Sequence, residues 1–354
     1  SPAPPDSRRP GLMNTISRRK HFIPVSTGMR GYLERWERRC ELPATYNDLL
    51  GFGESYPLCD KEGRATHWSS VLFPWEIQQE LYPRLTSIYS LLRTGDVHAV
   101  SHLFVERVDY CEFGNSRPFR IRIVNQYNDN YDHFYIKIAD ASRIYGLELE
   151  HLLSPNRINY LYDENCLVEE HIAGIPGDVF IGDYLEREDM NRVRIAKEFV
   201  KFSERCFIRL LGDMRSYNYV IDITPDFEDV QYRVRAIDFD QQSYEGRKTL
   251  YLPQFFKENN AVVELCSRLL NYPTMKQYQE EERSLIARRY TSESDRLRHL
   301  LHCMKADRAE PFEKVVQLRQ ELGEYHQTTR FDECNSMGEI VERNLEILLH
   351  RHLD

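Results

Sequence analysis

The chain has 354 residues, 41% of them hydrophobic, which is enough for one large or two modest domains with a sizeable core. Its net charge of −9 gives no overall attraction to nucleic acid or to an anionic membrane surface. No apolar run approaches the roughly 18 residues that a membrane span requires. Eight scattered cysteines lack metal-ligand spacing, which favours reduced thiols in a cytoplasmic protein. We therefore expect neither nucleic acid nor a membrane among its partners.

The first 101 residues divide into two expected parts. Residues 1–25 are polar and rich in proline and arginine, which predicts a disordered tail or a cloning remnant. Residues 26–101 are expected to form a helical N-terminal extension. Its clearest helix begins at Pro74 and ends at Gly95, because proline is favoured in the first turn of a helix and glycine just beyond the last.

Residues 102–171 change to the two-residue period of β-strands. The clearest case is the segment 119–124, in which Arg120 and Arg122 alternate with apolar residues. We predict a five-stranded antiparallel sheet with one helix inserted after the third strand. The predicted strands cover residues 102–110, 119–124, 133–138, 160–162 and 166–170, and the predicted helix covers 145–153.

The remainder of the chain, residues 172–354, is predicted to be mostly helical. Apolar residues between Asp189 and Leu210 are spaced for one buried helix face, and that helix leads to Asp213. A β-hairpin is expected over 219–223 and 232–237. Further helices are predicted over residues 260–270, 277–289, 292–304, 311–325 and 337–352.

Two acidic motifs flank the predicted hairpin. The first reads Gly-Asp-Met-Arg-Ser-Tyr-Asn and places Asp213 five residues before Asn218; the second reads Ile-Asp-Phe-Asp and places Asp238 in an apolar frame. Phosphoryl transfer from ATP needs a carboxylate beside the incoming hydroxyl, and an Asn and a second Asp to hold magnesium. The two motifs together, with Lys137 upstream, therefore indicate this chemistry.

The order of these elements and motifs resembles the protein-kinase-like superfamily, and is closest to its aminoglycoside phosphotransferase-like branch, over roughly residues 102–270. The resemblance implies an α+β, two-lobed protein-kinase-like fold, with a small antiparallel sheet lobe, a larger helical lobe and the N-terminal helical extension. It also implies ATP and Mg²⁺ in the cleft, and transfer of the γ-phosphoryl group to a hydroxyl acceptor of unknown identity. A small-molecule acceptor is favoured over a protein, because no recognisable activation segment follows Asp240.

The resemblance assigns roles to the two motifs. Asp213 would orient or activate the acceptor hydroxyl, and Arg215 would stabilise charge on the transferred group. Asn218 and Asp238 would hold magnesium. Each has a simpler interpretation as well: Asp213 and Asn218 as turn residues, Asp238 as the polar end of a strand, and Arg215 as the partner of a neighbouring acid. Asp240 stands where protein kinases have glycine, and either adds metal affinity or is exposed.

The sheet would supply the nucleotide contacts. Lys137 would reach the α- and β-phosphates, and we favour Glu148 over Glu150 as its ion-pair partner on the following helix. The turn at Gly114, Asn115 and Ser116 would cover the phosphates, although a tight hairpin with no ligand role is an equal alternative. Backbone groups near Glu170 and Ile172 would bind the adenine, with Gly174 permitting the turn. Lys137 could instead belong to a solvated outer face.

Two other functions remain open. A non-catalytic, kinase-like interaction protein is favoured by the glycine-poor loop, and disfavoured by the presence of Lys137, Asp213, Asn218 and Asp238 together. A kinase-fold nucleotidyltransferase acting on a protein would need unusual positive charge near the phosphates, for which Arg117, Arg120 and Arg122 are candidates. The simplest interpretation of Arg120 and Arg122 is the exposed face of a strand.

Overall fold

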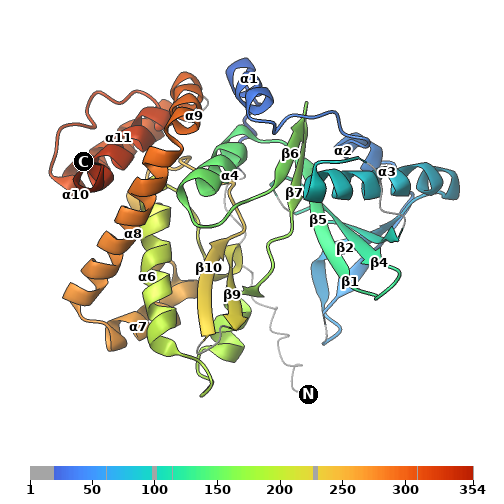
Figure 1. Cartoon of the computed structure of the whole chain (residues 1–354), viewed down its shortest axis with the longest axis horizontal. Coiled ribbons are helices and arrows are strands. Elements are labelled where there is room, and N and C mark those ends of the chain that lie inside the picture. The colour runs from blue at the N-terminus through green and yellow to red at the C-terminus, as the bar shows by residue number, and fades with distance from the viewer. Residues whose placement is uncertain are drawn as a thin grey trace, which may run out of the picture.

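A computed structural model describes residues 20–60, 62–97, 102–113, 115–225, 230–308 and 310–353. It is an α+β structure in which a seven-stranded antiparallel sheet lies beside a mainly helical part (Figure 1). The helix α4 lies between the sheet and the C-terminal helices. In the described part of the chain, no helix is both long enough and apolar enough to cross a membrane.

The seven-stranded sheet has the order β1-β2-β3-β4-β5-β7-β6, and every neighbouring pair is antiparallel. All five predicted strands are confirmed, as is the helix inserted after the third of them. The strands are β3 (Leu103–Tyr110), β4 (Phe119–Asn125), β5 (Tyr131–Ile138), β6 (Tyr160–Asp163) and β7 (Cys166–Glu170), and the helix is α4 (Ala141–Leu153).

The N-terminal extension is not entirely helical, which corrects the prediction for residues 26–101. A hairpin of two strands widens the sheet, and its second strand pairs with β3 through Ser70 and Asp109. The segment also contains the predicted helix, which ends where Gly95 adopts a φ of 75°. Its elements are α1 (Thr27–Arg35), α2 (Tyr46–Leu49), β1 (Glu54–Cys59), β2 (Ala65–Leu72) and α3 (Trp75–Thr94).

The prediction of a disordered tail over residues 1–25 is wrong for its last six residues. Residues 20–25 pack against α4: Ile23 is buried, and its N–H donates to the carboxylate of Asp140 at 2.9 Å. The ammonium of Lys20 lies 2.7 Å from the same carboxylate. Residues 1–19 lie outside the described part of the chain.

The helical part holds the predicted hairpin and all five of the later helices, with ends that shift by a few residues. A second sheet of three strands has the order β10-β9-β8. The strands and longer helices are β8 (Ile175–Pro176), α6 (Arg192–Arg209), β9 (Tyr219–Pro225), β10 (Val230–Ala236), α7 (Asn260–Leu269), α8 (Tyr272–Ser292), α9 (Ser294–Ala306), α10 (Phe312–His326) and α11 (Met337–Leu349). Short helical turns are Gly177–Val179, Phe180–Tyr184, Ser216–Asn218, Lys248–Tyr251, Pro253–Phe255, Lys257–Asn259 and His350–His352.

Two apolar cores stabilise these parts. One lies between the sheet and α3, where Leu85 and Ile88 join the inward-facing side chains of β3, β4 and β5. The other, larger core joins α4 to the helices and strands from α6 onward. Because nearly every residue of α4 is buried, its few charged side chains must find partners inside the protein. The partners of one of them, Arg143, belong to the candidate active site.

Candidate active site

The two acidic motifs lie side by side because the β9–β10 hairpin brings its ends together. The backbone N–H of Ile237 donates to the carbonyl of Asn218 at 3.0 Å, and that of Gly212 donates to Gln241 at 3.0 Å. A Cβ atom on Gly212 would lie only 3.0 Å from the Gln241 carbonyl oxygen, so a glycine suits this close approach. The pairing fixes the segment around Asp213 against the segment around Asp238.

Asp213 is held in an unusual backbone conformation with a φ of 59°, which Asp tolerates better than most residues. Its carboxylate accepts from the Nε of Arg215 at 2.8 Å, and its carbonyl accepts from the side-chain amide of Asn218 at 2.7 Å. Burial raises the pKa of Asp213, Arg215 opposes this rise, and the charge of Asp238 adds to it. Asp213 and Asn218 therefore lie in direct contact with each other.

Arg215 connects two acids. Its Nη1 lies 2.9 Å from Glu258, and its guanidinium lies 5.1 Å from the ring centroid of Phe256. The alternative that Arg215 pairs with a neighbouring acid is thus observed for both Asp213 and Glu258. These contacts hold the guanidinium of Arg215 between the carboxylates of Asp213 and Glu258.

Lys137 is buried, and its Nζ lies 2.9 Å from the carboxylate of Glu169 on β7. Burial lowers the pKa of the Lys137 ammonium and the charge of Arg143 lowers it further, while Glu169 opposes both effects. The interpretation of Lys137 as a solvated residue is therefore wrong. Its side chain instead enters a buried cluster of charges.

Glu148 is not the partner of Lys137, which corrects the predicted ion pair. Its fully buried carboxylate accepts from Arg38 at 3.0 Å and from Arg296 at 2.8 Å, and the hydroxyls of Tyr32 and Tyr160 also donate to it. These residues come from the N-terminal segment, α9 and β6. Glu148 thus faces away from β5, and its contacts join the N-terminal segment to the C-terminal helices.

Arg143 is a residue of the candidate site that the sequence did not lead us to expect. Its Nη1 donates at 2.9 Å both to Asp238 and to Asp240, and its Nε and Nη2 form a two-pronged contact with Glu169. The residue is only 2% exposed. A signal was present in the sequence, since a charged residue in an otherwise apolar helix requires a buried partner.

Asp240 is buried, so the alternative that it is exposed is wrong. Burial alone would raise the pKa of Asp240, but Arg143, Lys20 and Lys137 outweigh this effect and lower it. For Asp238 the balance is reversed: burial and the charge of Asp240 raise the pKa against the opposing charge of Arg143. Arg143 therefore neutralises two carboxylates that would otherwise repel each other.

Asn218 and Asp238 carry side-chain oxygens of the kind that magnesium binds. Among the described residues, no group of three or more His, Cys, Asp and Glu side chains could hold a metal ion. Magnesium, however, commonly uses only one or two protein oxygens together with phosphates and waters. The hydrogen bonds of Asp238 engage Oδ1, and those of Asn218 engage its amide nitrogen, which leaves one side-chain oxygen on each for a metal.

The turn expected to cover the phosphates lies close to Lys137. Ser116 accepts a hydrogen bond at 3.3 Å from the backbone N–H of Ile138, which follows Lys137 on β5. Asn115 is exposed and Ser116 is half-buried. Gly114, the third residue of the prediction, lies outside the described residues. The described part of the turn is thus fixed against the strand that carries the lysine.

The segment expected to hold adenine follows β7. The backbone N–H of Glu170 donates to Asn159 at 3.1 Å, which leaves this N–H unavailable to a ligand. Ile172 packs against the larger core. Gly174 has a φ of 154°, and a Cβ there would lie 2.8 Å from Val220, so both conformation and space require glycine as expected.

The arginines of β4 are engaged by acids. Arg120 lies 2.7 Å from the buried Asp109, and Arg122 lies 2.7 Å from Glu106. The guanidinium of Arg120 also stacks over Trp68, 4.5 Å from its ring centroid. The sheet surface beside Lys137 is consequently polar and aromatic, and the hydroxyl of Tyr135 contacts His171 there at 3.2 Å.

In comparison with known proteins, no family model matches the chain, and no curated protein matches its sequence.

Proposed function

We propose that the chain is an ATP- and Mg²⁺-dependent phosphotransferase that moves the γ-phosphoryl group to a hydroxyl acceptor. The observation that carries this proposal is a continuous series of ion pairs from Lys137 through Glu169 and Arg143 to Asp238. The series joins the lysine of the sheet to the acids of the helical part. Asp213 lies on the segment that pairs with the end of this series, since the N–H groups of Ile237 and Gly212 donate to Asn218 and Gln241 at 3.0 Å.

The topology supports a two-lobed protein-kinase-like fold as the framework. Five strands in the order β3-β4-β5-β7-β6 hold α4 between the third and fourth along the chain. A hairpin then carries the two acidic motifs at its ends. The five strands with α4, followed by the hairpin with its two motifs, are what the resemblance implies. The additional hairpin of β1 and β2 at the edge of the sheet is not part of it.

The proposed mechanism gives each residue one task. Asp213 accepts a hydrogen bond from the acceptor hydroxyl and takes its proton as the oxygen–phosphorus bond forms and the bond to ADP breaks. Arg215 fixes the carboxylate of Asp213 through the 2.8 Å contact. Asn218 and Asp238 would hold magnesium, which when bound neutralises charge on the phosphates. Lys137 would bind phosphate oxygens in exchange for part of its contact with Glu169.

A small-molecule acceptor remains favoured over a protein. After Asp240 the chain reaches the short helical turn Lys248–Tyr251 within a few residues, and α7 follows soon after. Such a short connection provides little surface for docking an extended peptide next to Asp213. A small hydroxylated compound needs only a pocket.

A non-catalytic interaction protein is the second candidate, and one observation favours it. Asp238 and Lys137 already have ion-pair partners in Arg143 and Glu169, so the cluster needs no ligand for its neutralisation. Nucleotidyl transfer is less well supported. Two of the three cations that it would use, Arg120 and Arg122, are held by Asp109 and Glu106.

The proposal is tested by thermal unfolding with ATP and magnesium, each alone and both together. A rise in melting temperature that requires both is expected, because a ligand that binds only the folded state stabilises it. Incubation with ATP labelled at the γ- or the α-phosphate, together with a panel of hydroxyl acceptors, then separates phosphoryl from nucleotidyl transfer. An unchanged melting temperature at millimolar ATP and magnesium would favour the interaction protein.

A further inference from the structure

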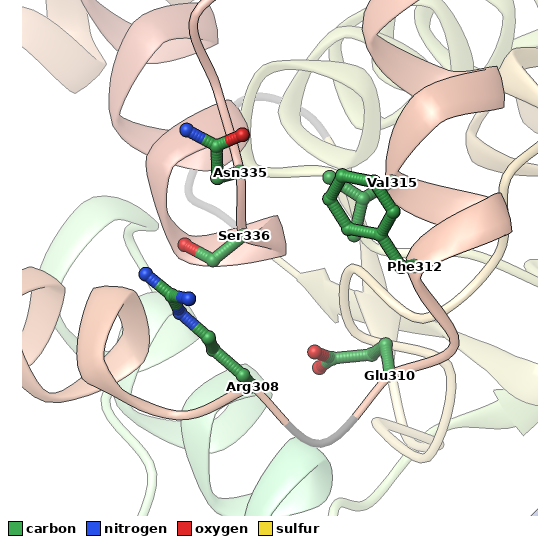
Figure 2. Close-up of a pocket in the computed structure, with 6 residues that line it drawn as sticks. All are labelled: Arg308, Glu310, Phe312, Val315, Asn335 and Ser336. Atoms are coloured by element: carbon green, nitrogen blue, oxygen red, sulfur yellow. The ribbon is translucent and has the colours of Figure 1, made fainter.

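A hollow of about 410 Å³ lies in the C-terminal helical part, and its lining is distinct from the candidate active site (Figure 2). Its lining comes from the connection between α9 and α10, the first turn of α10 and the start of α11. The lining residues are Arg308, Glu310, Phe312, Val315, Asn335 and Ser336. Its volume falls near the lower end of the range for small-molecule sites, so a small ligand suits it.

Two opposite charges enter this hollow without joining. Arg308 and Glu310 both extend into the open space (Figure 2). In the described part of the chain, neither side chain forms an ion pair with the other or with any neighbour. A guanidinium without a carboxylate partner is suited to bind an anionic group from a ligand.

Apart from Arg308, the cation that acts on Glu310 is Lys20, which already has a carboxylate partner. Burial raises the pKa of Glu310 to about 7; its own backbone N–H and Lys20 oppose the rise, while Asp307 and Asp140 add to it. The ammonium of Lys20 already lies 2.7 Å from Asp140, and Asp307 accepts a hydrogen bond from Tyr145. Lys20 is paired with Asp140, and Arg308 forms no ion pair with Glu310. A ligand cation can therefore approach Glu310 from within the hollow.

The rest of the lining consists of an apolar wall and, opposite it, two polar residues at the start of α11. The ring of Phe312 and the side chain of Val315 form the apolar wall opposite Asn335 and Ser336 (Figure 2). The hydroxyl of Ser336 accepts from the N–H of Glu339 at 3.2 Å and so caps α11. Asn335 donates to the carbonyl of Glu333 at 2.8 Å. Arg308 and Glu310 are therefore the polar groups most available for recognition.

We propose that this hollow binds a small zwitterion, namely a free amino acid with an apolar side chain. Its carboxylate would pair with Arg308, its ammonium with Glu310, and its side chain would pack on Phe312 and Val315. The inference is independent of phosphoryl transfer, because none of these residues belongs to the proposed catalytic machinery.

The test measures, by isothermal titration calorimetry, the binding of L-leucine and of two matched analogues to the whole chain. L-leucinamide lacks the carboxylate and N-acetyl-L-leucine lacks the ammonium group. We expect L-leucine to bind, and each analogue to bind at least about tenfold more weakly, since each loses one charged contact. Equal binding of either analogue would overturn the corresponding contact, and no binding of L-leucine, L-valine or L-phenylalanine at millimolar concentration would overturn the proposal.

Variants separate this site from general surface charge. Arg308→Gln and Glu310→Gln should each weaken L-leucine binding at least about tenfold, whereas Arg298→Gln, on the exposed face of α9, should leave it unchanged. Because the ligand ammonium favours ionised Glu310, binding should strengthen from pH 6 to pH 8 and release protons near pH 7. Glu310→Gln should abolish this pH dependence. Retained pH dependence in that variant would exclude Glu310 as the ammonium partner.

Discussion

The guanidinium of Arg143 lies 2.9 Å from the carboxylate of Asp238, and this contact joins α4 to the segment that follows β10. The same nitrogen lies 2.9 Å from Asp240. A single buried cation thus balances two carboxylates that are separated by one residue. Under the proposed function magnesium would bind the other oxygen of Asp238, so Arg143 and the metal compete for the negative charge of one carboxylate without sharing an oxygen atom.

Replacement of Arg143 tests this competition. Arg143→Gln leaves Asp238, Asp240 and Glu169 short of positive charge, so we expect the free energy of unfolding to fall by about 3–5 kcal/mol. Added magnesium should then stabilise the variant more than it stabilises the unchanged protein, because the metal replaces the missing cation. Thermal unfolding across a magnesium titration measures both effects.

Arg143→Lys provides the control for that experiment. It keeps the charge and loses the planar fork that contacts Glu169 and both aspartates, so its response to magnesium should lie between those of the other two proteins. An Arg143→Gln variant that gains no more from magnesium than the unchanged protein would contradict competition at Asp238.

Asp213→Asn separates chemistry from nucleotide binding. The amide keeps the shape of the side chain but cannot take the proton from the acceptor hydroxyl, so kcat should fall about 10²–10⁴-fold. ATP affinity in the presence of magnesium should change little. Quenched-flow kinetics with labelled ATP and equilibrium binding of a fluorescent analogue measure the two quantities.

Asp222 on β9 is the matched control, since it is a half-buried carboxylate on the same hairpin without a role in the proposed mechanism. Asp222→Asn should retain full turnover. Asp238→Asn should lose the magnesium dependence of ATP binding as well as turnover. Equal turnover in Asp213→Asn and Asp222→Asn would refute the assignment of Asp213.

The pH dependence of turnover follows from the surroundings of Asp213. Burial raises the pKa of its carboxyl, and activity needs the ionised form, so kcat should fall as the pH drops through a value above the ordinary range for aspartate. Arg215 opposes the rise. Arg215→Gln should therefore move the acidic limb of the profile to higher pH, in addition to lowering kcat. A limb that stays in place or moves to lower pH would exclude Arg215 as the group that keeps Asp213 ionised.

The sheet was predictable where one face is buried and the other is polar. In β4, Phe119, Ile121 and Ile123 enter the core while Arg120 and Arg122 lie on the opposite face, and the two-residue period is plain. The hairpin of β1 and β2 was not predictable in this way. Nearly all of β1 is exposed, so no alternation marks it, and its place is set by pairing with distant residues.

The acids of the candidate site were predictable from the sequence, as were Lys137 and Arg215, but Arg143 and the ion-pair partner of Lys137 were not. Asp213 and Asn218 are recognised by their five-residue spacing, and Asp238 by its apolar neighbours Ile237 and Phe239. Whether a carboxylate of α4 reaches Lys137 depends on which face of α4 meets the sheet, and the partner is instead Glu169 on β7. Arg143 and Glu148 are five residues apart, which turns their side chains about 140° from each other around the helix. Packing of α4 against α8 and α9 decides that Arg143 faces the acids.

Glu148 offers the last prediction, because its contacts give it a structural role in place of the expected nucleotide role. Glu148→Ala leaves Arg38 and Arg296 without their shared buried carboxylate, so the free energy of unfolding should fall by about 3–5 kcal/mol. Glu106→Ala removes the half-exposed partner of Arg122 and should cost about 0–1 kcal/mol. Urea denaturation compares the two. ATP affinity of folded Glu148→Ala protein, measured well below its melting temperature, should match that of the unchanged chain; a selective loss of ATP affinity with little loss of stability would instead restore Glu148 to the nucleotide site.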